Sequence, residues 1–456
     1  MILKIKPIKK RNLVFYFANL LSAFLLVSET TIAIKPFLLV LLSLLMIPNP
    51  LSFIPMLFVS SWSITFVAIP GLAAYFYYLV LFFVSIVVSL MVNEEKTITF
   101  VSKIPAARMA ILFAIWITVT GFYSVSGQWY GAVKLALFIV PLILVSRLRL
   151  SNLGFCRTSI DIMAIFFSAY CFYIIMFNPA IYYSDLSTIG SKSIRSDMNP
   201  NTASQIVLVL FTILYSEMFR TKKYWLLAFA ALNAGTLMFL GSRTAFFAMA
   251  IISIVYLMLV LKTSIWNKAL LFVFFIAMFF VLFSLGNGMG RSDRLSISTI
   301  EEDQGSGRFY TWEVLLTEVV PYHWVKGVGV GKANYENLPI FTLDADNLYV
   351  DLLTATGVVG LTLFLAYYIL NLAHLFRYRK KKRDWDFLIA IFLAYFFEGI
   401  GETVYDLPML WFFGFLSMLA INDLKYAEAT PEMAPAPEPV VDVPEKWTPP
   451  YQKRYK

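Results

Sequence analysis

GNGMGRSDRLSIST, residues 286–299, opens a polar stretch that runs to residue 360. The stretch continues as EEDQGSGRFYTWEVLLTEVV (301–320) and PYHWVKGVGVG (321–331), and it enters an apolar helix at DADNLYVDLLTATGVVG (344–360). No other long polar passage lies between two apolar segments of this chain. Arginines, carboxylates and glycines gather in it, so we expect the chemistry of the protein to lie here.

Composition defines the class of protein. The chain has 456 residues, of which 59% are hydrophobic and 14% charged, and its mean hydropathy is +0.74. Soluble domains are about 45–50% apolar and about 25% charged. The apolar excess extends along the whole chain, which indicates an all-α, polytopic integral membrane protein.

Charge and metal-binding residues exclude several functions. The net charge of +9 does not indicate nucleic-acid binding, because basic residues of membrane proteins usually mark cytoplasmic loops. Two cysteines, Cys156 in a short basic loop and Cys171 in an apolar segment, support neither a disulfide framework nor a zinc site. Only two histidines occur, His323 and His374, so we expect no histidine-rich metal centre and no cofactor.

A membrane-spanning helix needs about 20 mostly apolar residues. On that basis the sequence predicts about 12–14 spans. The candidates are residues 12–28, 32–48, 51–69, 71–92, 109–124, 131–146, 159–178, 203–218, 225–241, 244–261, 268–285, 347–371, 386–403 and 406–421.

Orientation follows from the basic residues. With residues 1–11 in the cytoplasm and an uncleaved first helix, alternation leaves only ten of the 37 lysines and arginines outside, as the positive-inside bias predicts. Both termini are then cytoplasmic. The predicted parts are N-terminal transmembrane helices (1–285), a large periplasmic loop (286–345), C-terminal transmembrane helices (346–421) and a disordered cytoplasmic tail (422–456), whose Pro, Glu and Ala content cannot form a core.

Cations on the outer side oppose the bias and are therefore informative, although membrane-interface snorkelling is an alternative explanation for each. Arg195 lies in the outer loop 181–202, where Asn201 is a predicted N-cap of the next helix. Arg243 lies in a very short outer connection, Gly241–Thr244, in which Ser242 can cap the following helix. A helix N-terminus beside an arginine is a natural receptor for phosphate.

The large loop supplies another arginine. After Gly307, apolar residues recur at helical spacing as far as Pro321, which indicates an amphipathic helix on the outer membrane surface, with Arg308 at its start. The following GVGVG run, 327–331, lacks the GK[ST] ending of a phosphate-binding P-loop. It is better suited to tight turns or close packing near substrate.

Acidic residues mark the entry to the helix after the loop. They are Asp344, Asp346 and Asp351, together with Asn347. Asn347 and Asp351 are four residues apart and share a helical face. Carboxylates near a helix N-terminus also favour its dipole, so a structural role is the alternative for Asp346.

Chemistry that fits these groups is transfer from a lipid-linked pyrophosphate donor. Arginines would bind the diphosphate and stabilise its departure, and a carboxylate would accept a proton from an incoming sugar hydroxyl. No metal ion is required if arginines neutralise the charge.

The order of these motifs resembles the bacterial O-antigen polymerase and O-antigen ligase superfamily. The resemblance rests on Arg195 with the NPN at 199–201, Gly241-Ser242-Arg243, Gly307-Arg308 with Trp312, the GVGVG run, and DNLYVDLLTATGVVG at 346–360. It implies a GT-C-like membrane fold and metal-independent, inverting transfer of polysaccharide from undecaprenyl diphosphate in the bacterial inner membrane.

Site residues follow from the same resemblance. Arg243 and Arg308 are similar to the family's diphosphate-binding arginines, with Arg195 a third. Ligases typically have His-Asn where this chain has Asp346-Asn347, which favours the polymerase branch and makes Asp346 the first candidate for the base.

Three other residues, Asp344, His323 and Asp351, remain alternative bases. The acidic residue expected nine positions after the ligase histidine is Ala355 here. Substrate contacts are also expected from Arg195, Asn201 and Asn347.

Three functions are therefore open. The favoured one is a polymerase that moves a growing glycan from undecaprenyl diphosphate to a new lipid-linked repeat. The alternatives are a ligase that joins polymer to lipid A core, and a flippase for lipid-linked oligosaccharides, against which the absence of a clear internal repeat counts. Expected partners are lipid-linked repeat units and the bilayer, with a chain-length regulator as a candidate and no nucleic acid.

Overall fold

A computed structural model describes residues 10–28, 34–62, 71–92, 98–100, 104–124, 129–177, 193–194, 198–257, 264–266, 269, 273, 308–330, 345–379, 384–403 and 407–429. Within these residues the protein is helical apart from one two-stranded ribbon. Five helices are long and apolar enough to cross a membrane: Ala73–Met91, Pro105–Phe122, Leu153–Phe177, Pro200–Thr221 and Leu348–Arg377. The predicted all-α, polytopic membrane fold is therefore confirmed.

Elements of the first part of the chain follow the predicted apolar segments closely. They are α1 (Lys10–Val27), α2 (Lys35–Met46), η1 (Pro50–Ser52), α3 (Phe53–Ser60), α4 (Gly71–Val92), β1 (Ile98–Phe100), α5 (Pro105–Phe122), α6 (Tyr130–Val145), β2 (Leu148–Leu150) and α7 (Leu153–Phe177). The predicted span 51–69 differs most, because a 3₁₀ turn at Pro50 precedes an α-helix of only eight residues.

The second part contains α8 (Pro200–Thr221), α9 (Leu226–Leu240), α10 (Arg243–Val255), α13 (Arg308–Val314), the π-helical turn η5 (Leu315–Val319), α14 (Val320–His323), α15 (Leu348–Arg379), α16 (Asp386–Glu398) and α17 (Pro408–Ala429). Helix α17 runs eight residues beyond the predicted end at 421. Apart from residues 269 and 273, the candidate span 268–285 lies outside the described residues, as does the predicted disordered tail beyond residue 429.

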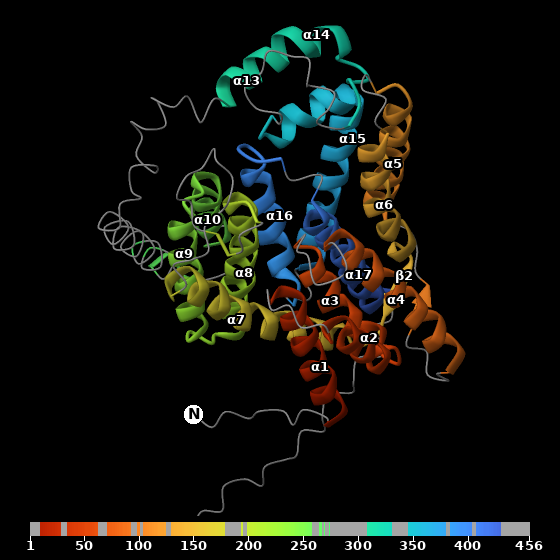
Figure 1. Ribbon diagram of the computed structural model, residues 1–456, viewed down its shortest axis with the longest axis vertical. Helices are drawn as coiled ribbons and strands as arrows, with labels where there is room; N and C mark the ends of the chain where they lie inside the picture. Colours follow the sequence, from red (N-terminus) through yellow and green to blue (C-terminus); the bar gives the residue numbers. More distant parts are fainter. Residues whose placement is uncertain are drawn as a thin grey trace, which may run out of the picture.

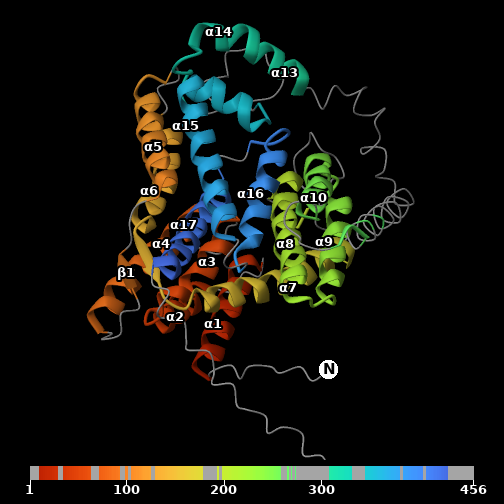
Figure 2. The ribbon, with the colours of Figure 1, turned by 180° about the vertical axis from the view of Figure 1, so that it is seen from behind.

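Figures 1 and 2 show how the elements are arranged. Helices α8, α10 and α16 stand side by side, α5 lies along the long part of α15, and α6 packs beside α5. Helices α13 and α14 lie across one end of this bundle, and α1 and α2 lie toward the other end. Helix α8 is buried on nearly all sides, as expected for a helix that is apolar around its circumference.

The ribbon was not predicted. Strands β1 and β2 pair antiparallel, with Ile98 opposite Leu150 and Phe100 opposite Leu148. Each strand has only three residues, which is too short for a hydrophobic alternation to be recognised in the sequence.

A buried ionic cluster joins α7, α8 and the start of α16 at the end of the bundle opposite α13. Arg157 Nη2 donates to Glu217 Oε2 at 2.8 Å, and Arg220 Nη2 donates to Glu217 Oε1 at 2.6 Å. Arg220 also reaches Asp384 at 3.2 Å, and the Arg157 guanidinium lies 3.8 Å from the Phe387 ring centroid.

This cluster corrects the placement of two residues. The sequence placed Cys156, and with it the neighbouring Arg157, in a short basic loop before the predicted span 159–178, but α7 begins at Leu153 and contains both. Both side chains are buried. Helix α7 therefore extends beyond its most apolar part, because the charge of Arg157 is neutralised inside the protein rather than by solvent.

We expect Glu217→Ala to destabilise the protein strongly, because it leaves two guanidiniums with reduced compensation. Breaking a buried ion pair by removing one partner typically costs about 3–5 kcal/mol. Thermal melting of the purified protein in detergent measures the loss. Arg149→Ala is the matched control, since the Arg149–Asp423 pair is longer, at 3.6 Å, and partly exposed, and such pairs contribute about 0–1 kcal/mol. Equal melting temperatures for the two variants would contradict this expectation.

Candidate functional site

Arg243 is positioned by a tight connection between α9 and α10. Gly241 ends α9 in the left-handed conformation, with φ of 72°, and its N–H bonds to the carbonyls of Leu237 and Met238. Ser242 occupies the N-cap position of α10, but its side chain makes no capping hydrogen bond, so the predicted cap is present only in position. Arg243 is then the first residue of α10, at its amide-rich end.

Arg308 begins a helical segment, residues 308–323, that we call the lid. The apolar run that indicated this helix ends at Pro321, but the helical segment continues through Pro321 to His323. The π-helical turn Leu315–Val319 comes directly before the proline. Proline lacks an N–H and its ring clashes with the preceding turn, and a widened turn accommodates both.

The buried face of the lid packs on the protein. Leu315 and Val319 form a small core with Val328 and Ala345. Trp312 Nε1 also donates to the Ala345 carbonyl at 2.5 Å. The predicted amphipathic helix is therefore present, although part of its apolar face contacts the protein itself.

Below the lid, α15 is broken at Gly357. This residue has φ of 68° and ψ of −176°, and Figures 1 and 2 show the part before it turned away from the long part after it. The predicted span 347–371 is therefore present but interrupted, with a short helix before Gly357 and the longer part of α15 after it. A side chain at Gly357 would overlap the Val325 carbonyl, so the break requires glycine.

Hydrogen bonds from the segment after α14 close this break. Val328 N–H donates to Thr354 O and Gly329 N–H to Ala355 O, both at 2.9 Å, while Val358 N–H donates to Trp324 O at 2.7 Å. These bonds replace those that an unbroken helix would make between residues four apart. The predicted tight turns and close packing of the GVGVG run are thus observed in its described part.

Arg308 contacts carboxylates from two other elements. Its Nε donates to Asp346 Oδ2 at 3.2 Å, and its Nη2 donates to Glu402 Oε1 at 3.0 Å. Asp346 precedes α15 and Glu402 follows α16, so one guanidinium joins the lid to two helix ends. Burial lowers the pKa of Arg308, but the charges of Glu402 and Asp346 outweigh it and raise that pKa above its ordinary value.

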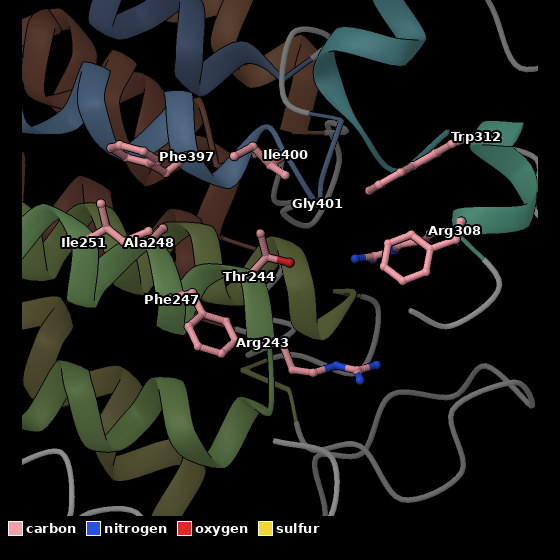
Figure 3. A pocket seen from close by; sticks show the side chains of 11 residues that line it. Arg243, Thr244, Phe247, Ala248, Ile251, Arg308, Trp312, Phe397, Ile400 and Gly401 are labelled. Atoms are coloured by element: carbon pink, nitrogen blue, oxygen red, sulfur yellow. The ribbon is translucent and has the colours of Figure 1, made fainter. Parts of the chain in front are cut away.

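Arg243 and Arg308 line the same pocket, which has a volume of about 260 Å³. Figure 3 shows both guanidiniums on one side of it, with Phe247, Ile251 and Phe397 on the other. The pocket lining consists of Arg243, Thr244, Phe247, Ala248, Ile251, Arg308, Phe309, Trp312, Phe397, Ile400 and Gly401. Such a pocket suits a ligand with an anionic group and an apolar group.

Two asparagines at helix starts have structural partners. The predicted cap Asn201 is wrong, because Asn199 is the N-cap of α8 and its Oδ1 accepts from Asn201 N–H at 2.9 Å. Pro200 at the first helical position is the sequence signal for this. Asn347 Oδ1 accepts from the N–H groups of Tyr349 and Val350, and its Nδ2 donates to Ile400 O at 2.8 Å.

Of the remaining candidates, the two described ones, Asp351 and His323, do not line the pocket. Asp351 is buried in the first part of α15 and does not line the pocket. His323 ends α14, fifteen residues along the lid, which corresponds to about 20 Å of helix. Arg195 and Asp344 lie outside the described residues.

Glu402 was missed as a site residue. The sequence shows that it lies near the outer end of an apolar segment, but its ion pair with Arg308 joins residues 94 positions apart. In the described residues no group of three or more His, Cys, Asp or Glu side chains is arranged to hold a metal ion.

Fold and pocket together define a multi-pass membrane protein with paired guanidiniums at one end of its helices. Residues 228–365 match a protein family described as O-Antigen ligase, and this segment contains Arg243, Arg308 and Asp346 but not Glu402. The matched segment is therefore similar to a domain of that family. No curated protein matches the chain significantly.

We expect Gly357→Ala to disturb the lid, because the added methyl group would overlap the Val325 carbonyl and the positive φ disfavours any side chain. The protein should melt at a lower temperature, and limited proteolysis should cut the lid sooner than in the parent protein. Gly154→Ala is the matched control, since a methyl group there meets no atom within 4 Å and alanine favours a helix. Unchanged lid protection in Gly357→Ala would contradict the proposed packing.

Proposed function

We propose that the chain is a glycan polymerase, which transfers a growing surface polysaccharide from undecaprenyl diphosphate to a new lipid-linked repeat unit. The observation that carries the proposal is the placement of Arg243 and Arg308 in one pocket, with Asp346 in contact with Arg308. The matched family supplies the substrate class, lipid-linked glycans.

In this proposal the two guanidiniums bind the donor diphosphate. Arginine is suited to the task because its planar fork offers five N–H donors that match phosphate oxygens and it stays charged. The charge that develops on the departing diphosphate would be stabilised at a site already arranged to receive it. Neutralisation by guanidiniums removes the need for a metal ion in this step.

The transfer itself balances as a direct displacement. A hydroxyl oxygen of the acceptor sugar attacks the anomeric carbon of the donor, and the bond from that carbon to the diphosphate oxygen breaks. The diphosphate leaves with the electron pair on its lipid carrier, and the hydroxyl proton passes to Asp346. One displacement inverts the anomeric centre. Asp346 is suited to accept the proton because its side chain is 31% exposed.

Apolar residues of the pocket support a lipid-linked donor. Phe247 and Ile251 lie on α10, and Phe397 lies on α16, opposite the guanidiniums in Figure 3. A prenyl chain could leave the pocket along these side chains while the diphosphate stays at the arginines. This arrangement supports a site open to the bilayer. The distribution of basic residues supports its placement at the outer face of a bacterial inner membrane, with both termini in the cytoplasm.

The second candidate is a ligase that joins finished polymer to lipid A core, which the description of the matched family favours. Asp346-Asn347 stands where ligases typically have His-Asn, and this substitution favours the polymerase. A flippase has less support, because the described arginines of the pocket lie at helix ends rather than midway along broken spans.

Arg243→Ala and Arg308→Ala should each reduce polymer formation by about 10²–10³-fold, the typical effect of removing one group that stabilises transition-state charge. The measurement is elongation of lipid-linked repeats by purified protein in detergent. Lys326→Ala is the matched control, because it removes an exposed cation of the adjoining segment that does not line the pocket. Full activity in both arginine variants at normal protein level would refute the site.

Deletion of the gene distinguishes the two transfer reactions. Loss of a polymerase should leave lipopolysaccharide core capped with a single repeat, whereas loss of a ligase should leave uncapped core and polymer retained on the lipid carrier. Gel electrophoresis of lipopolysaccharide shows which pattern occurs, and complementation with the intact chain should restore the parent pattern.

A further inference from the structure

We propose that Glu402 is a positioning residue that holds Arg308 in the pocket, and that Asp346 is the exchangeable partner which the donor diphosphate displaces from Arg308. The inference rests on the proposed donor site and assigns different roles to the two carboxylates that contact Arg308. Glu402 lies outside the segment 228–365 that matches the family.

Glu402 is the closer and more buried partner of Arg308. Its Oε1 lies 3.0 Å from Arg308 Nη2, and its side chain is 11% exposed. Burial makes this pair expensive to break, because a separated carboxylate would stay in a poorly hydrated place. The ion pair with Glu402 therefore persists when a ligand arrives.

The backbone that carries Glu402 is fixed on two sides. Asn347 Nδ2 donates to Ile400 O at 2.8 Å, and Leu348 N–H donates to Gly399 O at 2.7 Å. On the other side Gly401 lies against Thr244, whose Oγ1 would be 2.5 Å from an added methyl group. Helices α10 and α15 thus hold the segment, so Glu402 offers Arg308 a carboxylate at a defined position.

Asp346 is the more easily displaced partner. Its contact with Arg308 Nε is longer, at 3.2 Å, and its side chain is 31% exposed, so water can replace the guanidinium at low cost. Its backbone has φ of 44°, a left-handed conformation that is uncommon outside glycine, although aspartate tolerates it better than most residues.

Charge explains why one carboxylate must give way. Arg308 with two carboxylates carries a net negative charge, and this disfavours a second anion. When a diphosphate takes the place of Asp346, Arg308 stays neutralised on one side by Glu402 and binds phosphate on the other. The released aspartate loses its stabilising cation and becomes a better proton acceptor. Donor binding and activation of the base are then one event.

A purely structural role for Glu402 predicts a different pattern. If it only fastens the lid, its loss should lower stability, and removal of Asp346 should add to the damage. If it positions Arg308, its loss lets Asp346 take both edges of the guanidinium and compete with the donor. Removal of Asp346 should then restore donor binding.

The test measures binding of radiolabelled farnesyl diphosphate to the full-length purified protein, separately from polymer elongation. Glu402→Gln should raise Kd about tenfold. Asp346→Asn should leave Kd unchanged or lower while elongation falls at least about 10²-fold. The double variant should bind more tightly than Glu402→Gln alone, although it stays inactive. Glu313→Gln is the matched control, because Glu313 is an exposed glutamate of α13, the helix that begins with Arg308.

Two results overturn the inference: an unchanged Kd in Glu402→Gln, or a double variant that binds no more tightly than Glu402→Gln. If the glutamine variant does not fold, Glu402→Asp tests the same point with the charge kept, and it should bind within about threefold of the parent protein; a tenfold loss there overturns the inference. Arg308→Ala distinguishes failure of this inference from failure of the proposed donor site. Parent-like binding of farnesyl diphosphate in that variant refutes the donor site itself.

Discussion

Backbone hydrogen bonding at the break in α15 is the constraint on which the lid end of the protein depends. A helix interrupted near a membrane leaves carbonyl and N–H groups that lipid cannot pair. Here the segment after α14 pairs them, and it can approach closely because Gly327 and Gly357 have no side chains. The lid is thus joined to a membrane-spanning helix by main-chain bonds, and the start of the lid is directed toward the pocket.

The ion pairs of Arg308 hold the opposite end of the lid, where the helical segment begins. Main-chain bonds of Trp324 and Val328 fix the segment directly after the lid, and Arg308 fixes the start of the lid at Asp346 and Glu402. A site formed between these attachments can be rigid even though it lies at the meeting point of separate helices. Rigid placement of charged groups is what electrostatic stabilisation of a departing anion requires.

The sequence predicted which polar residues lie at helix ends better than it predicted which of them contact one another. Arg243 and Asp346 stand beside apolar segments and Arg308 begins a predicted amphipathic helix, so the sequence predicts that each lies near a membrane boundary. Arg243 and Arg308 share one pocket, and Asp346 and Glu402 contact Arg308. These relationships depend on how distant helices pack, which no local pattern encodes.

Other differences have local causes. The break in α15 lies inside an uninterrupted apolar run, and a glycine there does not by itself indicate a left-handed residue. The start of α7 was placed too late because Arg157 is charged, yet Glu217 of another helix neutralises it. The cap of α8 was readable from Pro200, since proline favours the first helical position and points to Asn199 before it.

The position of Glu402 beyond the matched segment has a consequence for the modular use of this protein. Residues 228–365 carry both pocket arginines, so they would be the natural unit to exchange between relatives in a chimaera. That unit would separate Arg308 from Glu402 and Asn347 from the Ile400 carbonyl that it binds. The smallest transferable piece that keeps these partners together extends through the end of α16 to residue 402.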